Sequence, residues 1–245
     1  MTVTLSGNRA IVTGAARGIG FAIARSLADL GANVAMLDIA DQGREAADAV
    51  GGCFVQVDLG DPDALSEAMT TAMDTLGGID ILVNNAGILS HMPFLEVGTL
   101  DWNRTMAVNA RATLQTTQAA ARRMIAQGTG GRVINIASMA AKSGGRHEVH
   151  YAASKAAVVA LTRVAAIELG EHGITANSIC PGYVLTEMGA ATRTEEDVAA
   201  WSALSPLGRL GEPEDVAGVA TFLASTSGGY LTGQAINVTG GMIMH

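Results

Sequence analysis

The chain has 245 residues, of which 15 are Lys or Arg and 23 are Asp or Glu, so its formal net charge is −8. Hydrophobic residues make up 49% of the chain and charged residues only 16%, which excludes a disordered polyelectrolyte. The acidic balance argues against a general nucleic-acid-binding protein. The two cysteines fit neither a disulfide framework nor a zinc motif. No apolar run reaches the roughly 20 residues that span a bilayer, and the N-terminus lacks the layout of a secretion signal, so we expect a cytoplasmic protein.

Short apolar runs alternate with helical patterns from the beginning of the chain. The run Arg9–Thr13 leads into a glycine-rich turn, Gly14–Gly20, then a helical pattern over Phe21–Leu30 and a second run, Asn33–Leu37, which ends on Asp38. A βαβ unit of about 30 residues requires parallel strands and a right-handed crossover. This first segment therefore predicts an α/β fold.

The same alternation continues to the C-terminus. Buried parallel strands are predicted at Cys53–Val57, Ile79–Val83, Arg132–Ile136, Thr175–Ile179 and Gln234–Val238. Helices are predicted between them, at Asp63–Leu76, Leu100–Gln127, Tyr151–Glu171 and Pro213–Ala224. Six or seven strands with intervening helices indicate one doubly wound parallel sheet, in a single domain over residues 1–245. The long mixed stretch at about 186–211, which contains Trp201, follows a strand end and is a candidate substrate lid.

The spacing of Gly14, Gly18 and Gly20 predicts a turn that binds a dinucleotide. Glycines let the backbone approach a pyrophosphate, and the helix that follows offers free N–H donors at its N-terminus. Asp38 can accept hydrogen bonds from the adenosine ribose and would repel a 2′-phosphate. Arg17 is a counter-signal because it could reach such a phosphate, and Asp38 could instead cap a turn. We weigh Asp38 more heavily and predict NAD rather than NADP.

Two further loops at strand ends are candidate cofactor contacts. Asp58 and Leu59 follow the third predicted strand, where they could meet the adenine. The segment Asn84–Gly87 ends the fourth strand, and its small residues and amides allow close contact with a cofactor. The same segment could also be a structural turn, and the two roles are compatible.

Tyr151 and Lys155 share one face at the start of a predicted helix. A free tyrosine has a pKa of about 10 and is a poor base at neutral pH, but a neighbouring cation favours the phenolate and lowers that pKa. Tyr151 could then exchange a proton with an alcohol or a carbonyl while a hydride moves to or from a nicotinamide. Taken alone, the pair could also be an exposed tyrosine beside a solvated lysine.

Two polar residues strengthen the catalytic interpretation. Ser138 follows a predicted strand, so it should lie at the carboxyl edge of the sheet, where open α/β sheets bind ligands. Its hydroxyl could hold and polarise the substrate oxygen. Asn109 lies inside a predicted helix, where asparagine is mildly unfavourable. Anchoring a water that relays protons past Lys155 would explain its presence.

In these motifs the chain resembles the short-chain dehydrogenase/reductase family. The similar segments occur in family order over essentially the whole chain: Thr13–Gly20, Asn84–Gly87, Asn109, Ser138, Tyr151 with Lys155, and Pro181–Gly182 with Thr186. The resemblance implies a Rossmann-type fold, NAD(P) dependence and a catalytic tetrad. In that tetrad Tyr151 is the acid/base and Lys155 lowers its pKa and binds the nicotinamide ribose. Ser138 orients the substrate and Asn109 holds the relay water.

The residues and the resemblance together predict the contacts of each ligand. The expected cofactor contacts are Gly14, Arg17, Gly18, Ile19, Gly20, Asp38, Asp58, Leu59, Asn85, Ala86, Gly87, Tyr151, Lys155, Pro181, Gly182, Val184 and Thr186. The expected substrate contacts are Ser138, Met139, Ala140, His147, Tyr151, Tyr183 and Met188. His147 and His150 flank the tyrosine, although a surface or interface histidine is the more frequent case. The five histidines show no ligand spacing, so we expect no metal.

The leading functional hypothesis is NAD-linked oxidation of a secondary alcohol, such as a polyol or cyclic alcohol, and the reverse reduction. One alternative is NADPH-dependent reduction of a 3-oxoacyl thioester, whose acidic carrier protein would need a basic patch such as Arg122, Arg123 and Arg132. Another is a non-enzymatic NAD-binding protein on the same fold.

Two features predict self-assembly. Helical apolar positions such as Val158, Val159 and Val164 favour a closed symmetric oligomer, and the resemblance suggests a homotetramer. The tail Met242–His245 is unusually apolar for a free end, so we expect it to pack at a subunit interface.

Overall fold

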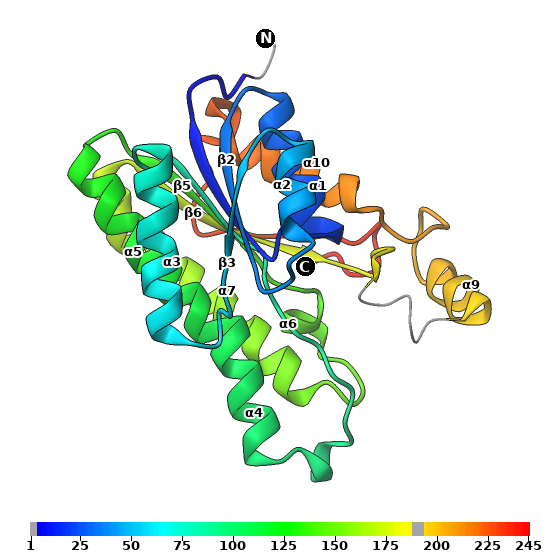
Figure 1. Cartoon of the computed structure of the whole chain (residues 1–245). Helices are drawn as coiled ribbons and strands as arrows, with labels where there is room; N and C mark the ends of the chain where they lie inside the picture. The colour runs from blue at the N-terminus through cyan, green and yellow to red at the C-terminus, as the bar shows by residue number, and fades with distance from the viewer. Residues whose placement is uncertain (1–3, 188–193) are drawn as a thin grey trace.

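The computed structural model describes residues 4–187 and 194–245. Within these residues, seven strands form one fully parallel sheet in the order β3-β2-β1-β4-β5-β6-β7 (Figure 1). The strands are β1 (Arg9–Thr13), β2 (Asn33–Asp38), β3 (Cys53–Gln56), β4 (Ile81–Asn84), β5 (Gly131–Ile136), β6 (Ile174–Pro181) and β7 (Ala235–Val238). The predicted doubly wound parallel sheet is confirmed.

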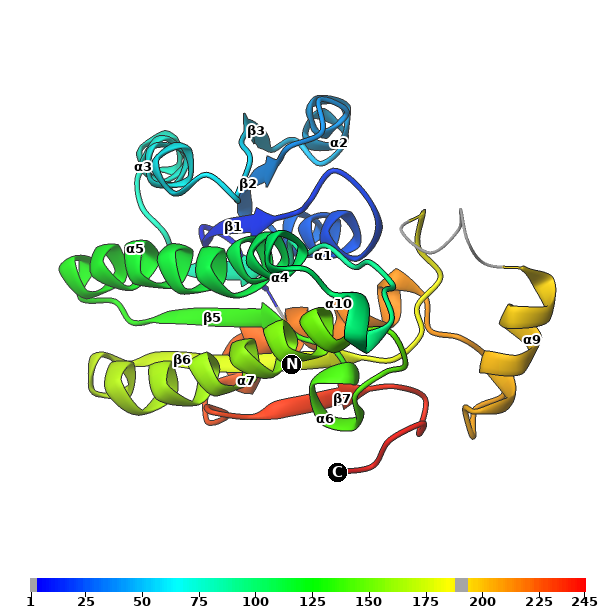
Figure 2. The same ribbon diagram turned by 90° about the horizontal axis from the view of Figure 1, so that it is seen from below.

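Helices cover both faces of this sheet (Figure 2). One face carries α1 (Gly18–Asp29), α2 (Gly43–Ala49) and α10 (Pro213–Ala224), and the other carries α3 (Pro62–Leu76), α5 (Ala112–Gln127) and α7 (Val149–Leu169). The shorter elements are η1 (Phe94–Glu96), α4 (Thr99–Met106), η2 (Ala107–Arg111), α6 (Ala140–Ser143), η3 (Gly170–His172), α9 (Glu195–Ala203) and η4 (Thr226–Gly228).

The two layers of helices explain why the strands read as continuous apolar runs. Ile11 and Val12 are neighbours in β1 and both are fully buried. Val12 packs with α1 and α10, whereas Ile11 packs with α3 and α5. Leu82 and Val83 of β4 divide between the two faces in the same way. A strand covered on both faces needs apolar side chains at every position rather than at alternate ones.

The direction in which successive strands are added to the sheet reverses beside β1. This strand lies between β2 and β4, so the chain first builds one half of the sheet and then returns to build the other. The loops that follow β1 and β4 lie beside each other at the carboxyl edge. Open α/β sheets bind ligands at such a reversal point, and the turns after β1 and β4 are the two segments predicted to meet a cofactor.

One predicted helix is interrupted in the structure. The sequence predicted a single helix over Leu100–Gln127, but α4 and α5 are separated by η2, a π-helical turn that contains Asn109. A π-helical turn changes the backbone hydrogen-bond spacing for a few residues, and such turns are frequent at functional sites. The helical pattern in the sequence continues through this turn, because one extra residue barely disturbs the periodicity.

The predicted lid lies beyond the carboxyl ends of the strands, where α9 stands apart from the sheet (Figure 2). Its base is joined by a bridge between Val184 and Gly211. The Tyr183 and Trp201 rings stack with their centroids 4.6 Å apart and their planes 9° apart. Met188, an expected substrate contact, belongs to the segment 188–193 and lies outside the described residues. In the described part of the chain, no helix combines the length and apolarity needed to cross a bilayer.

Candidate active site

The turn after β1 is built for close approach of another group to its backbone. Gly14 and Gly18 have φ angles of 62° and 56°, in the left-handed region that favours glycine. A Cβ atom on Gly14 would lie 2.7 Å from the Cα of Ala86, and one on Gly20 would collide with the Gly14 carbonyl oxygen. The N-cap of α1 is Arg17, whose exposed side chain makes no capping hydrogen bond. No side chain of the cap residue therefore competes for the free N–H groups at this helix end.

Asp38 connects this turn to the end of β2. Its Oδ2 accepts a hydrogen bond from the Ala16 N–H at 3.0 Å, and its Oδ1 accepts one from the Ala40 N–H at 3.0 Å. The carboxylate thus does have the capping role that the sequence left open as an alternative. Each oxygen still has a second acceptor position for a ribose hydroxyl. The glycine cradle, the uncapped helix end and the acidic strand end together fit a dinucleotide.

The segment after β4 closes the other side of the glycine turn. The Asn85 amide donates hydrogen bonds to the carbonyl oxygens of Thr13 and Gly14 at 3.1 and 2.8 Å. The N–H groups of Asn85 and Ala86 both donate to the Thr13 hydroxyl. Side-chain and backbone bonds therefore hold the ends of β1 and β4 together, as the sequence predicted for this loop. Thr13 itself was not selected from the sequence, although it directly precedes Gly14.

The remaining predicted cofactor residues near this edge differ in how exposed their side chains are. Asp58 is exposed and its Oδ1 accepts a hydrogen bond from the Gly60 N–H at 2.8 Å. The side chain of Leu59 is only 6% exposed and belongs to the core with α3, so Leu59 can offer a ligand only its backbone. Ile19 is half-buried and packs against the core beneath α1.

Three of the four predicted catalytic residues converge at the carboxyl edge of β5. Tyr151 and Lys155 are one turn apart near the start of α7, and Ser138 follows β5. A side-chain hydrogen bond joins Tyr151 to Ser138. The Nζ of Lys155 lies 5.8 Å from the centroid of the Tyr151 ring and donates to the Ile136 carbonyl oxygen at 2.8 Å. A phenol, a hydroxyl and an ammonium group are therefore gathered at one point of the sheet.

Burial moves both titratable groups toward their neutral forms. It raises the pKa of Tyr151 to about 12, against the lowering effect of the Ser138 hydrogen bond and with a smaller raising effect from Glu148. Burial also lowers the pKa of Lys155 to about 8. The expected lowering of the Tyr151 pKa by Lys155 is not found in the protein by itself, because burial is the largest effect and raises this pKa, and Lys155 is not among the groups that shift it.

Asn109 is fully buried within η2, and its side chain is nearly saturated with hydrogen bonds. Its Oδ1 accepts from the Ile88 N–H at 2.8 Å, while its Nδ2 donates to the Ile88 carbonyl at 3.0 Å and to the Ser154 hydroxyl at 2.9 Å. The amide thereby joins the loop after β4 to α7 beside Lys155. Ser154 was not selected from the sequence, although its position between Tyr151 and Lys155 was a usable signal.

The chain after β6 returns to the same place. A methyl group of Thr186 comes within 3.4 Å of the point where a Cβ on Gly18 would lie. The N–H of Met139 donates to the Pro181 carbonyl at 2.9 Å, and Gly182 approaches Thr239 closely enough that a Cβ would lie 3.1 Å from its Cα. Residues about 170 positions apart thus border one site, together with Val184 at the base of α9.

A wall of polar contacts borders the tyrosine on its other side. His150 is fully buried and its Nε2 lies 2.7 Å from the Ser90 hydroxyl, so it is not the surface or interface histidine that the sequence favoured. His91 pairs with Glu148 at 3.1 Å. His147 is exposed, has a φ of 65° and accepts a hydrogen bond from the Met92 N–H through its carbonyl. Ala140 is buried at the start of α6.

Known proteins match this chain over nearly its whole length. A family model described as enoyl-(acyl carrier protein) reductase matches residues 14–243. An L-rhamnose 1-dehydrogenase (NAD(P)(+)) of Sphingomonas sp. is 38% identical over 249 residues, which covers 98% of this chain and 98% of the relative. A 3-oxoacyl-(acyl-carrier-protein) reductase of Aquifex aeolicus is 36% identical over 249 residues, which covers 99% of this chain and 100% of the relative.

A solved structure has the same fold as this chain. The crystal structure of a short-chain type dehydrogenase/reductase from Mycobacterium marinum superposes with a TM-score of 0.92 at 38% sequence identity. The match covers 99% of this chain and 98% of that one.

Proposed function

The chain belongs to the short-chain dehydrogenase/reductase family of NAD(P)-dependent oxidoreductases, and on this premise we propose that it interconverts a secondary alcohol of a small polyhydroxylated molecule and the corresponding ketone, with NAD as the cofactor. The observation that carries the proposal is the convergence of Tyr151, Ser138 and Lys155 beside the glycine turn. The sugar dehydrogenase named above supports a hydroxyl-rich substrate. A bound nicotinamide supplies the hydride acceptor or donor.

The side chains of this site divide the proton chemistry among themselves. Ser138 holds the substrate oxygen next to the Tyr151 hydroxyl. In ketone reduction the phenol, protonated at neutral pH because its pKa is about 12, donates its proton to that oxygen. In alcohol oxidation the phenolate form of Tyr151 accepts the proton and becomes the phenol; burial opposes the phenolate, and the Lys155 ammonium and the Ser138 hydroxyl favour it. Asn109 acts through Ser154 and the loop after β4, where it holds α7 in position.

Asp38 supports NAD over NADP. Its carboxylate is fixed by the Ala16 and Ala40 N–H groups at the end of β2, so it cannot easily turn away from a ligand there. The next residue is Ile39, an uncharged side chain that is 62% exposed. A 2′-phosphate placed beside this carboxylate would meet like charge at close range.

Steady-state rates with NAD and NADP, measured against sugars, polyols, simple secondary alcohols and 3-oxoacyl esters, test the substrate class and the cofactor together. We expect the highest kcat/KM with NAD and a polyhydroxylated alcohol. Tyr151→Phe should reduce kcat by about 10²–10⁴-fold, the usual contribution of a general acid or base. Retention of half the wild-type turnover or more by Tyr151→Phe would exclude this residue as the acid/base. Absence of turnover across the whole panel would favour a non-enzymatic NAD-binding protein.

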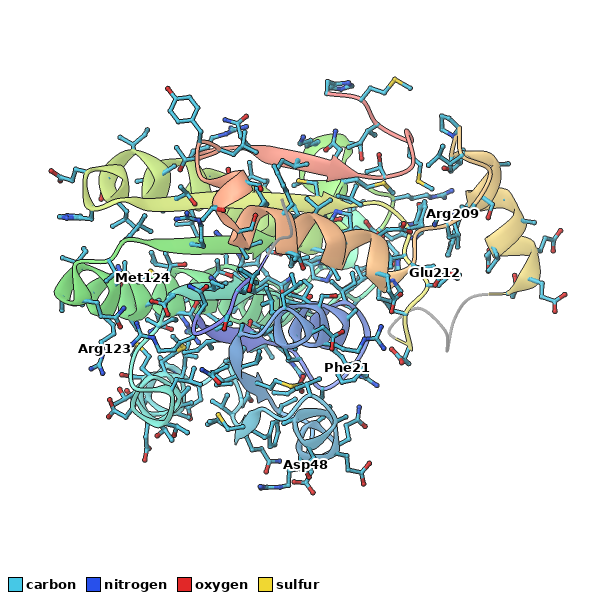
Figure 3. All side chains as sticks on the ribbon, turned by 90° about the horizontal axis from the view of Figure 1, so that it is seen from above. Phe21, Asp48, Arg123, Met124, Arg209 and Glu212 are labelled. Atoms are coloured by element: carbon cyan, nitrogen blue, oxygen red, sulfur yellow. The ribbon has the colours of Figure 1, made fainter. Side chains whose placement is uncertain are left out.

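Reduction of a 3-oxoacyl thioester with NADPH is a second candidate, supported by the Aquifex aeolicus relative. The positions of the basic side chains argue against it. Arg122 and Arg123 lie near the end of α5, and Arg132 lies at the start of β5. All three are therefore near the edge of the sheet opposite to the site (Figure 3 labels Arg123). Arg132 is half-buried and Arg123 lies 3.8 Å from Asp74. A carrier protein docked there could not present its thioester to Tyr151.

The proposal also covers the oligomeric state and the cellular location of the enzyme. We infer a homotetramer, since large apolar side chains are exposed along α4, α5 and α7, among them Leu100, Trp102 and Ile167. We also infer a cytoplasmic enzyme, which agrees with the free thiols Cys53 and Cys180.

A further inference from the structure

Glu148 is an acidic side chain fixed in the wall of the site. It is the N-cap of α7, three residues before Tyr151, and its side chain is 18% exposed. One carboxylate oxygen lies 3.1 Å from the Nε2 of His91, and the other is seated against Gly145, where a Cβ would collide with it. Contacts from two sides therefore hold this carboxylate in one place.

The loop that carries His91 is itself fastened to the start of α7. The Ser90 hydroxyl lies 2.7 Å from the Nε2 of His150, and the Met92 N–H donates to the His147 carbonyl at 2.8 Å. Together with the pair between His91 and Glu148, these are three successive contacts between the segments 90–92 and 147–150. These contacts fasten the segment 90–92 to the start of α7 and position the charge of Glu148.

The charge of Glu148 reaches the catalytic space. It raises the pKa of Tyr151 and that of Tyr183, in each case after the larger effect of burial. Tyr183 stacks on Trp201 of α9. The geometry of α7 agrees with this effect, because Glu148 is its N-cap and Tyr151 follows three residues later, so the two side chains start about one turn apart on the same side of the helix.

Cations in the described part of the chain do not cancel this charge. Lys155 directs its ammonium group to the Ile136 carbonyl. Lys142 directs its own to the Ala235 carbonyl and the Asn237 side chain, both in β7. Arg146 is exposed and forms no ion pair with Glu148. His91 is the ion-pair partner of Glu148 among the described residues, and it neutralises the carboxylate only when protonated.

We propose that Glu148 makes this site selective for uncharged polyhydroxylated substrates and excludes substrates that carry a carboxylate. This inference rests on the proposed function, since it concerns the same site. A fixed carboxylate accepts hydrogen bonds from substrate hydroxyls, and such charge-assisted bonds are stronger than neutral ones. The same carboxylate repels an anionic substrate in a partly desolvated site, where charges are poorly screened.

The test compares two substrates that differ at one terminal group, which is charged in only one of them. Sorbitol and gluconate share a six-carbon hydroxylated chain, but gluconate carries a carboxylate in place of one CH₂OH group. We expect the ratio of kcat/KM for gluconate to that for sorbitol to be below about 0.1 in the wild type, and Glu148→Gln to raise the ratio about tenfold, as expected for one charge at close range. The ratio cancels any effect of Glu148 on Tyr151, because both substrates use the same tyrosine.

Glu168→Gln is the matched control, because Glu168 is exposed at the other end of α7. It should leave the ratio unchanged. Added KCl supplies a check that needs no variant: it should lower the KM of the wild type for gluconate and leave that for sorbitol unaffected. An equal kcat/KM for both substrates in the wild type, or no change of the ratio in Glu148→Gln, would overturn the inference alone. A wild type that oxidises no polyol would overturn the proposed function with it.

Discussion

Tyr151 and Lys155 show how strongly burial can determine the chemistry of single residues. In water both groups would be weak participants at neutral pH, since tyrosine is protonated and lysine is charged. In the folded chain the pKa of Tyr151 rises to about 12 and that of Lys155 falls to about 8. The ammonium group therefore loses its proton at a much lower pH than a lysine in water does.

The lowered pKa of Lys155 predicts a pH dependence of stability. The pKa falls from 10.5 to about 8 on folding, so between these values the unfolded chain binds more protons than the folded chain. The free energy of unfolding must therefore rise with pH through this window. Relative to Lys155→Met, the wild type should gain stability between pH 8 and 9.5, a range below the ordinary pKa of tyrosine.

Urea denaturation of both proteins at several pH values measures this difference. The difference in unfolding free energy between wild type and Lys155→Met should change steadily from pH 8 to 9.5. Parallel curves over that range would contradict the lowered pKa. Arg123→Met, which removes a surface cation on α5, is a control that should give a nearly constant difference.

At the scale of single elements, the turn between β1 and α1 restricts the choice of residues strongly. The chain must turn sharply after Thr13, meet the segment after β4 and begin a helix, all within seven residues. Two of the glycines, Gly14 and Gly18, adopt left-handed φ angles. The third, Gly20, leaves room for the Gly14 carbonyl oxygen. The helix N-terminus that results is directed at the proposed pyrophosphate position.

This junction predicts opposite effects of the same substitution in two helices. Gly20→Ala places a methyl group against the Gly14 carbonyl, so it should destabilise the protein and weaken NAD binding at least tenfold. Gly218→Ala lies within α10, where an added Cβ meets nothing within 4 Å. It should raise the free energy of unfolding by about 0.5–1 kcal/mol, because alanine is the better helix former. Thermal unfolding with and without NAD measures both effects. Equal behaviour of the two variants would contradict this account of the turn.

For the whole molecule, one layer of helices carries several of the exposed large apolar side chains, although others, such as Leu95 and Tyr230, lie elsewhere. Leu100 is 85% exposed on α4, Val164 and Ile167 are 52% and 82% exposed on α7, and Leu114 is 40% exposed on α5. These helices lie side by side over one face of the sheet (Figure 2). The C-terminal tail is tied to β7, since Asn237 and Thr239 donate hydrogen bonds to the Ile243 carbonyl, and Met244 beyond it is 80% exposed.

This surface predicts how the proposed assembly can be broken. Ile167→Glu places a charge in the apolar layer, near the end of α7, where burial in an interface without a partner is costly. It should shift the protein from a tetramer to a smaller species in analytical ultracentrifugation. Ile39→Glu is the matched control, because Ile39 is also exposed but lies at the end of β2. Unchanged sedimentation of Ile167→Glu would place the interface elsewhere.

The order of strands and helices and the identity of the central residues could be predicted from the chain alone. Apolar runs covered on both faces, glycines before a helix and the pairing of Tyr151 with Lys155 are local patterns, and a local pattern can be read without knowing the fold. The interruption of the helix at Asn109 could not be predicted in this way. Neither could the burial of His150, since a histidine near a helix start carries no signal of its surroundings.

The sequence by itself therefore determined the parallel α/β architecture and the family, and it selected the residues that we propose for proton transfer. Only the tertiary structure decided the direction of the pKa shifts, the two hydrogen bonds that occupy Asp38 and the fixed position of Glu148 beside the tyrosine. The physical reason is that pKa values and hydrogen-bond partners depend on solvent exclusion and on groups distant in the chain. The folded-state pKa values and hydrogen-bond partners are set only when the strands and loops pack together.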